Sequence, residues 1–265
     1  MLESPLKTYR IGVLIFGALL LAWANIIWAQ FNPSAPLLAY KVIRKYPHDP
    51  TAFTQGLLYR DGFLYESTGL EGASSLRKVI IETGEVAQIK ILPEEYFAEG
   101  ITLFNKKIYL LTWRQYLGLI LDLQTFDKIS EFYYDTEGWG LTNDGKQLIM
   151  SDGSAVLRWL DPQSLQVTAE IIVTDGGKEV AGLNELEWIE GDIWANVWPT
   201  RKIAVIDPQK GQVKYWLDAS VLLREVSRLG RVDVLNGIAY DKETKRIWLT
   251  GKLWPYLYQI EVSND

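Results

Sequence analysis

Residues 97–113 read FAEGITLFNKKIYLLTW, and this stretch decides the fold class. Two strand-like runs, 101–104 and 108–113, flank the turn Asn105-Lys-Lys107. Short runs rich in β-branched and aromatic residues on either side of such a turn are typical of an antiparallel hairpin. Because the second strand of a hairpin ends beside the start of the first, we expect Glu99 and Trp113 at one rim of a sheet.

The phrase that opens this hairpin recurs along the chain. Five segments resemble one another: residues 53–56 (FTQG), 97–100 (FAEG), 138–140 (GWG), 182–185 (GLNE) and 234–237 (VLNG). Their last residues lie 44, 40, 45 and 52 positions apart, and a period of this size built from short strands is typical of propeller blades. We therefore predict an all-β, five-bladed β-propeller. A β-sandwich is the alternative, but it would not require this regular spacing.

One helix is expected within the repeats, over residues 219–229. Its apolar positions Val221, Leu222, Leu223 and Val226 fall on one side. This helix lengthens the connection between the fourth and fifth units, which explains the interval of 52 residues.

The N-terminal segment indicates export. Lys7 and Arg10 precede the apolar run 11–29, in which Asn25 is the only strongly polar residue. A run of about 20 apolar residues suffices to cross a bilayer as a helix, and a basic start with small residues at 22–24 also fits a cleavable signal peptide. We expect residues 1–30 to be a signal peptide or a membrane signal-anchor helix, a single N-terminal hydrophobic helix, with a buried soluble helix as the other interpretation. A linker and first strand over 31–44 and the propeller over 45–265 would follow, on the periplasmic or extracellular face.

Composition excludes several kinds of chemistry. The 265 residues contain no Cys and one His, His48, and the net charge is −6. A thiol nucleophile, a cysteine zinc site and a His-rich metal centre are therefore excluded, and the negative charge argues against a nucleic-acid partner. His48 itself is interpreted as a turn or closure residue. The protein must act through carboxylates, amides, lysines and indoles.

The propeller prediction collects polar and aromatic residues at one mouth of the central channel. The first strand of each blade lines the channel, and the residues at the start of these strands are Gln55, Glu99, Trp139, Asn184 and Asn236. The ends of the second strands are expected at the same mouth, with Glu66, Trp113, Asp152, Trp198 and Lys252. The set differs from blade to blade, which favours one asymmetric ligand site over five equal ones.

The repeated phrases also carry a resemblance to a known family. They are residues 47–49 (PHD), 53–57 (FTQGL), 66–69 (ESTG), 97–100 (FAEG), 139–141 (WGL), 183–186 (LNEL), 235–239 (LNGIA) and 251–255 (GKLWP). In this order and spacing they resemble the plant- and bacterial-type glutaminyl-peptide cyclotransferases over roughly residues 45–262. Ala98 departs from the family pattern, in which a Gly is common there. The resemblance implies a five-bladed propeller that cyclises the N-terminal glutamine of peptides or proteins to pyroglutamate and releases ammonia.

The resemblance further implies roles for individual residues. The residues that match the catalytic groups are Glu99, as general acid and base, with Asn184 and Lys252, which position or polarise the substrate. The residues that match the substrate-binding wall and pocket are Phe53, Gln55, Phe97, Trp113, Trp139 and Trp198. No cofactor or metal is required for this reaction. A structural calcium ion in the channel is left open, and we expect a monomer.

Two other functions compete with cyclisation. A non-catalytic propeller, such as a lectin or an envelope scaffold, would carry equivalent ligand groups in every blade, which this sequence does not. A glycoside hydrolase would use two carboxylates, for which Glu99 and Glu66 are the candidates.

Overall fold

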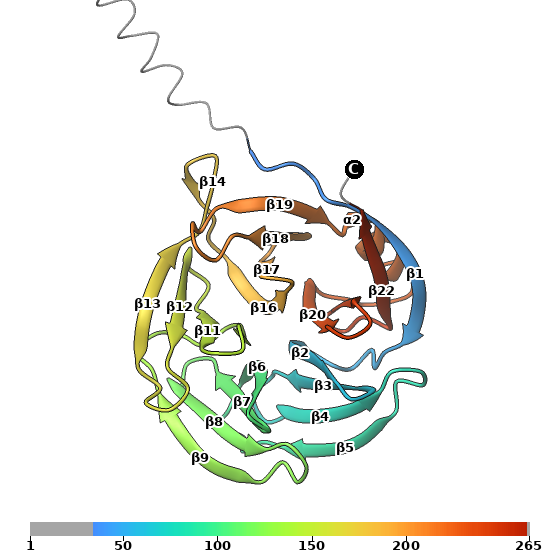
Figure 1. Cartoon of the computed structure of the whole chain (residues 1–265). Helices are drawn as coiled ribbons and strands as arrows, with labels where there is room; N and C mark the ends of the chain where they lie inside the picture. The colour runs from blue at the N-terminus through green and yellow to red at the C-terminus, as the bar shows by residue number, and fades with distance from the viewer. Residues whose placement is uncertain (1–33, 264–265) are drawn as a thin grey trace, which may run out of the picture. The chain divides into compact units, whose positions relative to one another are not determined.

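The described part of the chain is a ring of five four-stranded antiparallel sheets. The computed structural model describes residues 34–263, and its sheets are arranged around a central axis as blades (Figure 1). The five-bladed propeller predicted from the spacing is confirmed. The expected N-terminal hydrophobic helix lies outside the described residues.

Four blades are built from strands that follow one another in the chain. The first blade has β2 (Thr54–Arg60), β3 (Phe63–Thr68), β4 (Ser75–Ile80) and β5 (Val86–Ile91). The second has β6 (Ala98–Phe104), β7 (Lys107–Thr112), β8 (Leu117–Asp122) and β9 (Lys128–Tyr133). The third has β10 (Leu141–Asn143), β11 (Leu148–Ser151), β12 (Val156–Leu160) and β13 (Val167–Ile172). The fourth has β16 (Leu183–Ile189), β17 (Asp192–Val197), β18 (Lys202–Ile206) and β19 (Val213–Asp218).

The fifth blade closes the ring with strands from both ends of the described chain. It consists of β20 (Leu235–Asp241), β21 (Arg246–Gly251), β22 (Tyr256–Ser263) and β1 (Ala39–Pro47). β1 lies antiparallel to β22, with Tyr46 opposite Leu257. The boundary that the sequence suggested at residue 45 therefore falls inside a strand of the propeller.

The hairpins inside the blades follow from local sequence. In the first and fourth blades the turn between the first two strands places two successive residues at positive φ: 50° and 87° at Asp61-Gly62, and 50° and 95° at Glu190-Gly191. Asn105 and Lys106 do the same with 49° and 62°. Such turns match the right-handed twist of the flanking strands, and Gly and Asn adopt them at low cost.

The apolar core is divided among the interfaces between neighbouring blades. Leu58 and Leu76 of the first blade pack in one cluster with Leu110 of the second. The fully buried Trp248 joins the fifth blade to the first. The other three interfaces hold clusters of the same kind. Burial of one such side chain contributes about 1.5–3 kcal/mol, so packing across the interfaces holds together blades whose sheet hydrogen bonds run within each blade.

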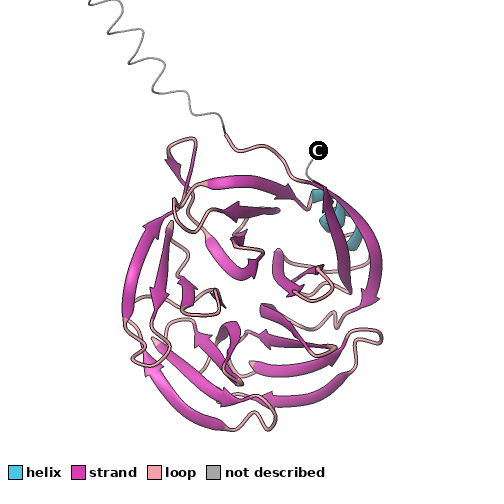
Figure 2. Ribbon diagram, viewed as in Figure 1, coloured by secondary structure: helices cyan, strands magenta, loops and turns pink. Residues whose placement is uncertain are grey.

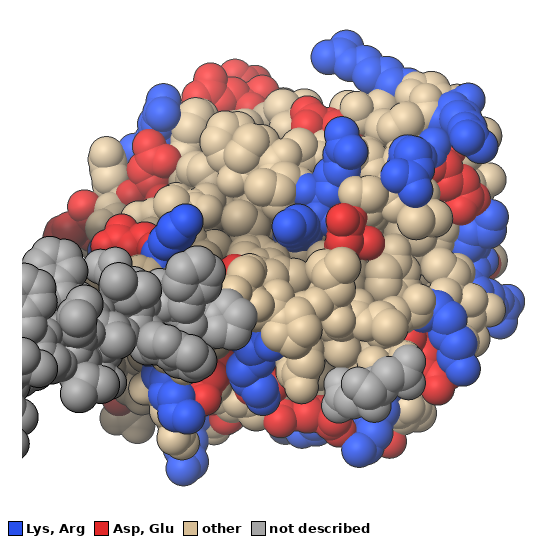
Figure 3. Space-filling view, turned by 90° about the horizontal axis from the view of Figure 1, so that it is seen from above, with Lys and Arg blue, Asp and Glu red and all other residues tan. Residues whose placement is uncertain are grey.

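Two small additions decorate the ring. Helix α2 (Ser220–Val226), cyan in Figure 2, buries Leu222 and Val226 between the fourth and fifth blades, which confirms a helix within 219–229. A short hairpin of β14 (Thr174–Asp175) and β15 (Lys178–Glu179) projects from the rim (Figure 1). None of the helices in residues 34–263 has the length and apolar character to cross a membrane. On the side seen in Figure 3, basic and acidic side chains are interspersed.

Candidate active site

Irregular strand pairing shapes the mouth of the channel. The pairing register shifts at the start of β2, β6, β16 and β20, the first strands of four blades. The residues within these irregular stretches include Gln55, Glu99, Asn184 and Asn236. A β-bulge re-aims a side chain that regular pairing would direct elsewhere. The four polar side chains are at most 5% exposed, so the bulges hold them in the interior of the ring.

Glu99 is the buried carboxyl group of this mouth. Its Oε1 accepts a hydrogen bond from Nε2 of Gln55 at 3.1 Å, and its backbone carbonyl accepts one from the hydroxyl of Ser67. Burial raises the pKa of Glu99 well above its ordinary value; the charge of Lys252 opposes this shift, and that of Glu137 adds to it. Glu99 is therefore protonated well into the pH range where an exposed glutamate is ionised.

Lys252 is the buried cation of the same mouth. It follows β21, is 6% exposed, and its Nζ lies 4.7 Å from the centroid of the Phe53 ring. Burial lowers the pKa of Lys252, whereas the charges of Glu99 and Asp233 act to raise it. The mouth thus combines a carboxyl group with a raised pKa and an ammonium group with a lowered pKa.

Two buried amides complete the polar set. Nδ2 of Asn236 donates to the backbone oxygen of Thr54 at 3.0 Å and to Oε1 of Gln55 at 3.3 Å. Among the described residues, Oδ1 of Asn184 and Oδ1 of Asn236 have no hydrogen-bond partner. Buried polar atoms are normally paired, so each of these two oxygens keeps an unused capacity to accept a hydrogen bond.

Aromatic rings form the wall around these groups. Phe97 packs edge-on against Phe53 with the ring centroids 6.2 Å apart, and its centroid is 5.5 Å from that of Trp113. Trp139 and Trp198 make a T-shaped pair at 5.8 Å, and Trp198 is 47% exposed. The structure thus brings the predicted aromatic residues together as two groups of neighbouring rings.

Two carboxylates that the sequence placed at this mouth have other partners. Glu66 is 1% exposed, and its Oε1 lies 3.0 Å from Nε2 of His48 and 2.6 Å from Oγ1 of Thr54. Asp152 forms a 2.5 Å ion pair with Arg158. Glu66, which we expected at this mouth from the sequence, lies inside β3 and faces His48. A carboxylate pair of Glu99 and Glu66, as a glycoside hydrolase would need, is therefore not formed.

Sequence reasoning missed one residue of the mouth, Glu137. Its Oε2 accepts hydrogen bonds from Nε1 of Trp113 at 2.8 Å and from Nε1 of Trp139 at 3.0 Å. Glu137 lies between β9 and β10, outside the repeated phrases. Its position two residues before Trp139 was the one available signal.

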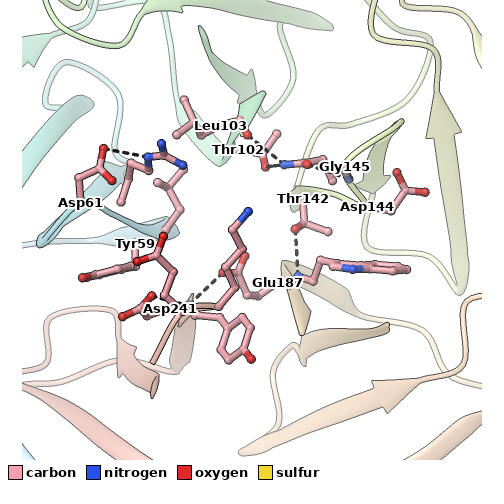
Figure 4. A pocket seen from close by; sticks show the side chains of 16 residues that line it. Tyr59, Asp61, Thr102, Leu103, Thr142, Asp144, Gly145, Glu187 and Asp241 are labelled. Carbon is pink, nitrogen blue, oxygen red and sulfur yellow. Dashed lines mark hydrogen bonds and ion pairs between the residues drawn. The ribbon is translucent and has the colours of Figure 1, made fainter. Parts of the chain in front are cut away.

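A cavity lies at the opposite end of the channel. It has a volume of about 390 Å³ and is lined by the turns that follow the first strands, with Thr102, Thr142 and Glu187 among its residues (Figure 4). Oε1 of Glu187 accepts a hydrogen bond from the backbone of Tyr240 at 2.9 Å. None of the predicted site residues lines this cavity, so the candidate active site is the mouth that contains Glu99.

Within residues 34–263, no group of three or more His, Cys, Asp or Glu side chains is arranged to hold a metal ion. The buried polar side chains described at the Glu99 mouth are a carboxyl, an ammonium and amides.

The fold and the site define a five-bladed propeller with one asymmetric, aromatic-walled site at one mouth of its channel. The chain belongs to the glutamine cyclotransferase family, whose model matches residues 16–262. It is 41% identical over 264 residues to a glutaminyl-peptide cyclotransferase of Arabidopsis thaliana, which covers 98% of this chain and 82% of the relative. It is also similar to the crystal structure of the glutaminyl cyclase of Myxococcus xanthus, with a TM-score of 0.82 and 34% identity over 87% of this chain and 100% of the other.

Proposed function

We propose that this protein is a glutaminyl-peptide cyclotransferase, which closes the N-terminal glutamine of a peptide or protein to pyroglutamate and releases ammonia. The observation that carries the proposal is the buried Glu99, which is hydrogen-bonded to Gln55 and interacts with the charge of Lys252 at one aromatic mouth, in a chain of the glutamine cyclotransferase family. No metal takes part in the proposed reaction.

The reaction joins two groups of one substrate residue. The α-amine attacks the side-chain carboxamide carbon, a C–N bond forms to close a five-membered ring, and the bond to the amide nitrogen breaks. Because nucleophile and electrophile belong to the same residue, the enzyme mainly has to fold the side chain back and hold it there. We assign this shaping to Trp113, Trp139 and Trp198, together with Phe53 and Phe97, which also exclude water.

Glu99 moves the proton in this mechanism. The attacking amine loses one proton and the departing nitrogen gains one, so a single carboxyl group can accept it and then donate it. A peptide α-amine has an ordinary pKa of about 7.7–8.0, and burial moves the pKa of Glu99 upward toward that range. A carboxylate with a raised pKa is a stronger base than an exposed glutamate, which favours its acceptance of the amine proton.

The remaining polar groups suit different substrate atoms. The unpaired Oδ1 of Asn184 is an acceptor, which fits an N–H of the substrate amine. The ammonium of Lys252 is only a donor, which fits the oxygen that gains negative charge as the ring closes. We therefore assign amine positioning to Asn184 and oxyanion stabilisation to Lys252.

The test is ammonia release from a Gln-Xaa dipeptide with a chelator present. We expect wild-type turnover to survive chelation and kcat to fall about 10²–10⁴-fold in Glu99→Gln. Glu131→Gln, an exposed carboxylate on β9, is the matched control and should retain activity. Unchanged turnover in Glu99→Gln would remove Glu99 from the mechanism. Absence of turnover in well-folded wild type would favour a non-catalytic binding propeller.

We propose further that the propeller is exported, that residues 11–29 hold it at the membrane when they are retained, and that it acts as a monomer. The apolar run behind Lys7 and Arg10 supports the first two points. Protease added to intact cells should digest the propeller only if it is exported, and deletion of residues 1–30 should leave it inside. Light scattering of the purified domain tests the monomer.

A further inference from the structure

We propose that Glu137 is a positioning residue of the active site, which orients two indoles of the aromatic wall through one carboxylate. The inference rests on the proposed function, because it gives these indoles a substrate to hold. We call Glu137, Trp113, Trp139 and Arg114 the indole clamp.

The geometry of the clamp is specific. Oε2 of Glu137 accepts from Nε1 of Trp113 at 2.8 Å and from Nε1 of Trp139 at 3.0 Å. Its other oxygen, Oε1, accepts from Nε of Arg114 at 2.9 Å. The guanidinium of Arg114 lies 3.8 Å from the centroid of the Trp113 ring. Each indole has one N–H donor, so both rings direct their only polar atom to the same carboxylate oxygen.

The clamp joins rings that would otherwise be independent. Trp113 follows β7 in the second blade, whereas Trp139 precedes β10 in the third. Trp113 packs beside Phe97, and Trp139 packs beside Trp198. Their shared acceptor therefore couples the two groups of rings in the wall. Hydrogen bonds to an ionised acceptor are short and about twice as strong as neutral ones, which suits them to fix ring orientation.

The segment that carries Glu137 is itself held in place. The hydroxyl of Tyr134 donates to the backbone oxygens of Thr112 and Leu117 at 2.6 and 2.9 Å. The backbone N–H of Gly138 donates to the backbone oxygen of Trp113 at 3.1 Å. A Cβ at Gly138 would lie 2.5 Å from the Tyr134 hydroxyl oxygen, so glycine permits this close approach. Glu137 is thus anchored on both sides along the chain.

Electrostatics supports the clamp. Burial raises the pKa of Glu137, but hydrogen bonds from Trp139, Arg114 and Trp113 together outweigh it, so the pKa lies below its ordinary value. The side chain is therefore ionised at neutral pH. Its charge in turn adds to the upward shift of the Glu99 pKa, against the opposing charge of Lys252.

Two variants separate geometry from charge. Glu137→Gln keeps an oxygen that can accept from the indoles but removes the charge, whereas Glu137→Ala removes both. We expect kcat/KM to fall about 10–100-fold in Glu137→Ala, because the indoles that position the substrate would lose the acceptor that orients them. The fall should be smaller in Glu137→Gln. The acid limb of the pH profile should move to lower pH in Glu137→Gln, because the negative charge beside Glu99 is gone.

The indole N–H resonances give a readout that does not depend on turnover. Loss of the charged acceptor should shift the resonances of Trp113 and Trp139 together in Glu137→Ala, with assignments from Trp113→Phe and Trp139→Phe. The matched control is Asp175→Asn, because Oδ2 of Asp175, in the β14–β15 hairpin at the rim, accepts from Nε1 of Trp216 on the outer strand β19 at 2.9 Å. The control should move one indole resonance and leave kcat/KM unchanged.

A double-mutant cycle tests whether Glu137 acts through the indoles. The effect of Glu137→Ala on kcat/KM should shrink when Trp113 and Trp139 are both Phe, because coupled residues are not additive. Unchanged resonances of Trp113 and Trp139 in Glu137→Ala, or kcat/KM within twofold of wild type, would overturn the clamp. Lack of turnover in folded wild type would instead contradict the proposed function. The indole resonances would still test the geometry of the clamp in that case.

Discussion

Gln55 of the first blade links Glu99 of the second blade to Asn236 of the fifth. Nε2 of Gln55 donates to Oε1 of Glu99 at 3.1 Å, and Oε1 of Gln55 accepts from Nδ2 of Asn236 at 3.3 Å. The three residues lie at the irregular starts of β2, β6 and β20. The orientation of Glu99, the proposed catalytic acid, therefore depends on the Gln55 side chain of the neighbouring blade. Gln55 is in turn held by its hydrogen bond from Asn236 of the fifth blade.

Replacement of Gln55 by Leu should weaken catalysis through Glu99. The amide N–H favours the ionised carboxylate, so its loss should raise the pKa of Glu99 further. We expect the acid limb of the pH profile of kcat/KM to move upward and the maximum to fall about 10–100-fold. Gln88→Leu, at a surface hydrogen bond to the backbone of Gln124, should behave as wild type. An unshifted acid limb in Gln55→Leu would contradict this role.

Loss of the Lys252 charge should act on the same carboxyl group and on the transition state. The Lys252 charge lowers the pKa of Glu99 against the effect of burial, so Lys252→Met should raise it. Removal of one donor to a developing oxyanion costs about 10²–10³ in kcat. Steady-state kinetics over a pH series would measure both effects. Lys214→Met, at an exposed ion pair with Asp192, is the control, and a Lys252→Met variant with normal kcat would exclude oxyanion stabilisation by Lys252.

The buried pair of His48 and Glu66 should define a pH window of stability. Burial opposes the charge on His48, but the Glu66 carboxylate outweighs it and raises the pKa of His48 above 6.5. Burial likewise opposes the charge on Glu66, and His48 and Thr54 keep its pKa below 4.5. The stabilisation is thus fully present between pH 4.5 and 6.5. It is lost as pH rises through the folded pKa of His48 or falls through that of Glu66.

Urea unfolding of Glu66→Gln near the middle of this window measures the effect. Removal of one partner from a buried pair costs about 3–5 kcal/mol, and the loss should diminish at higher pH, where His48 is neutral. The matched variant is Glu261→Gln, whose carboxylate pairs with Lys41 in an exposed ion pair and should change stability by less than about 1 kcal/mol. Equal losses in the two variants would show that burial of the pair is unimportant.

The blade count was predictable because each blade is a local repeat. Turn residues such as Asp61-Gly62 follow the phrases at the start of the first strands, which recur at intervals of 40 to 52 residues, and each hairpin follows from its own sequence. The closure was not predictable in the same way. β1 pairs with β22, from the opposite end of the chain, and no local pattern specifies a partner at that separation.

The site was predictable where it follows from strand starts. Glu99, Gln55 and Asn184 lie where the repeats place them. Glu66 does not, because β3 ends at Thr68 and Glu66 therefore lies within the strand. Glu137 could not be predicted from the sequence, because its role depends on two indole N–H groups that come together only in the folded ring.

Glu187, which lines the cavity opposite the Glu99 mouth, should make the stability of the protein depend on pH. This effect is separate from catalysis. Burial raises the pKa of Glu187 to about 8, so the folded protein holds a proton that the unfolded chain releases near pH 4.5. The contribution of protonated Glu187 to stability should fall as pH rises between these two values, and it should be absent above the upper one. Glu187→Gln cannot titrate, and its amide oxygen can still accept from the backbone of Tyr240. We expect urea unfolding to show this variant more stable than wild type at pH 9 by on the order of 2 kcal/mol, with little difference at pH 4.

Part of the pH dependence of wild-type stability should persist in Glu187→Gln, because Glu185 is also buried with a raised pKa. Glu190→Gln, at the exposed pair with Lys245, should not reproduce the gain, and parallel stability curves for wild type and Glu187→Gln would show that Glu187 is ionised in the folded protein.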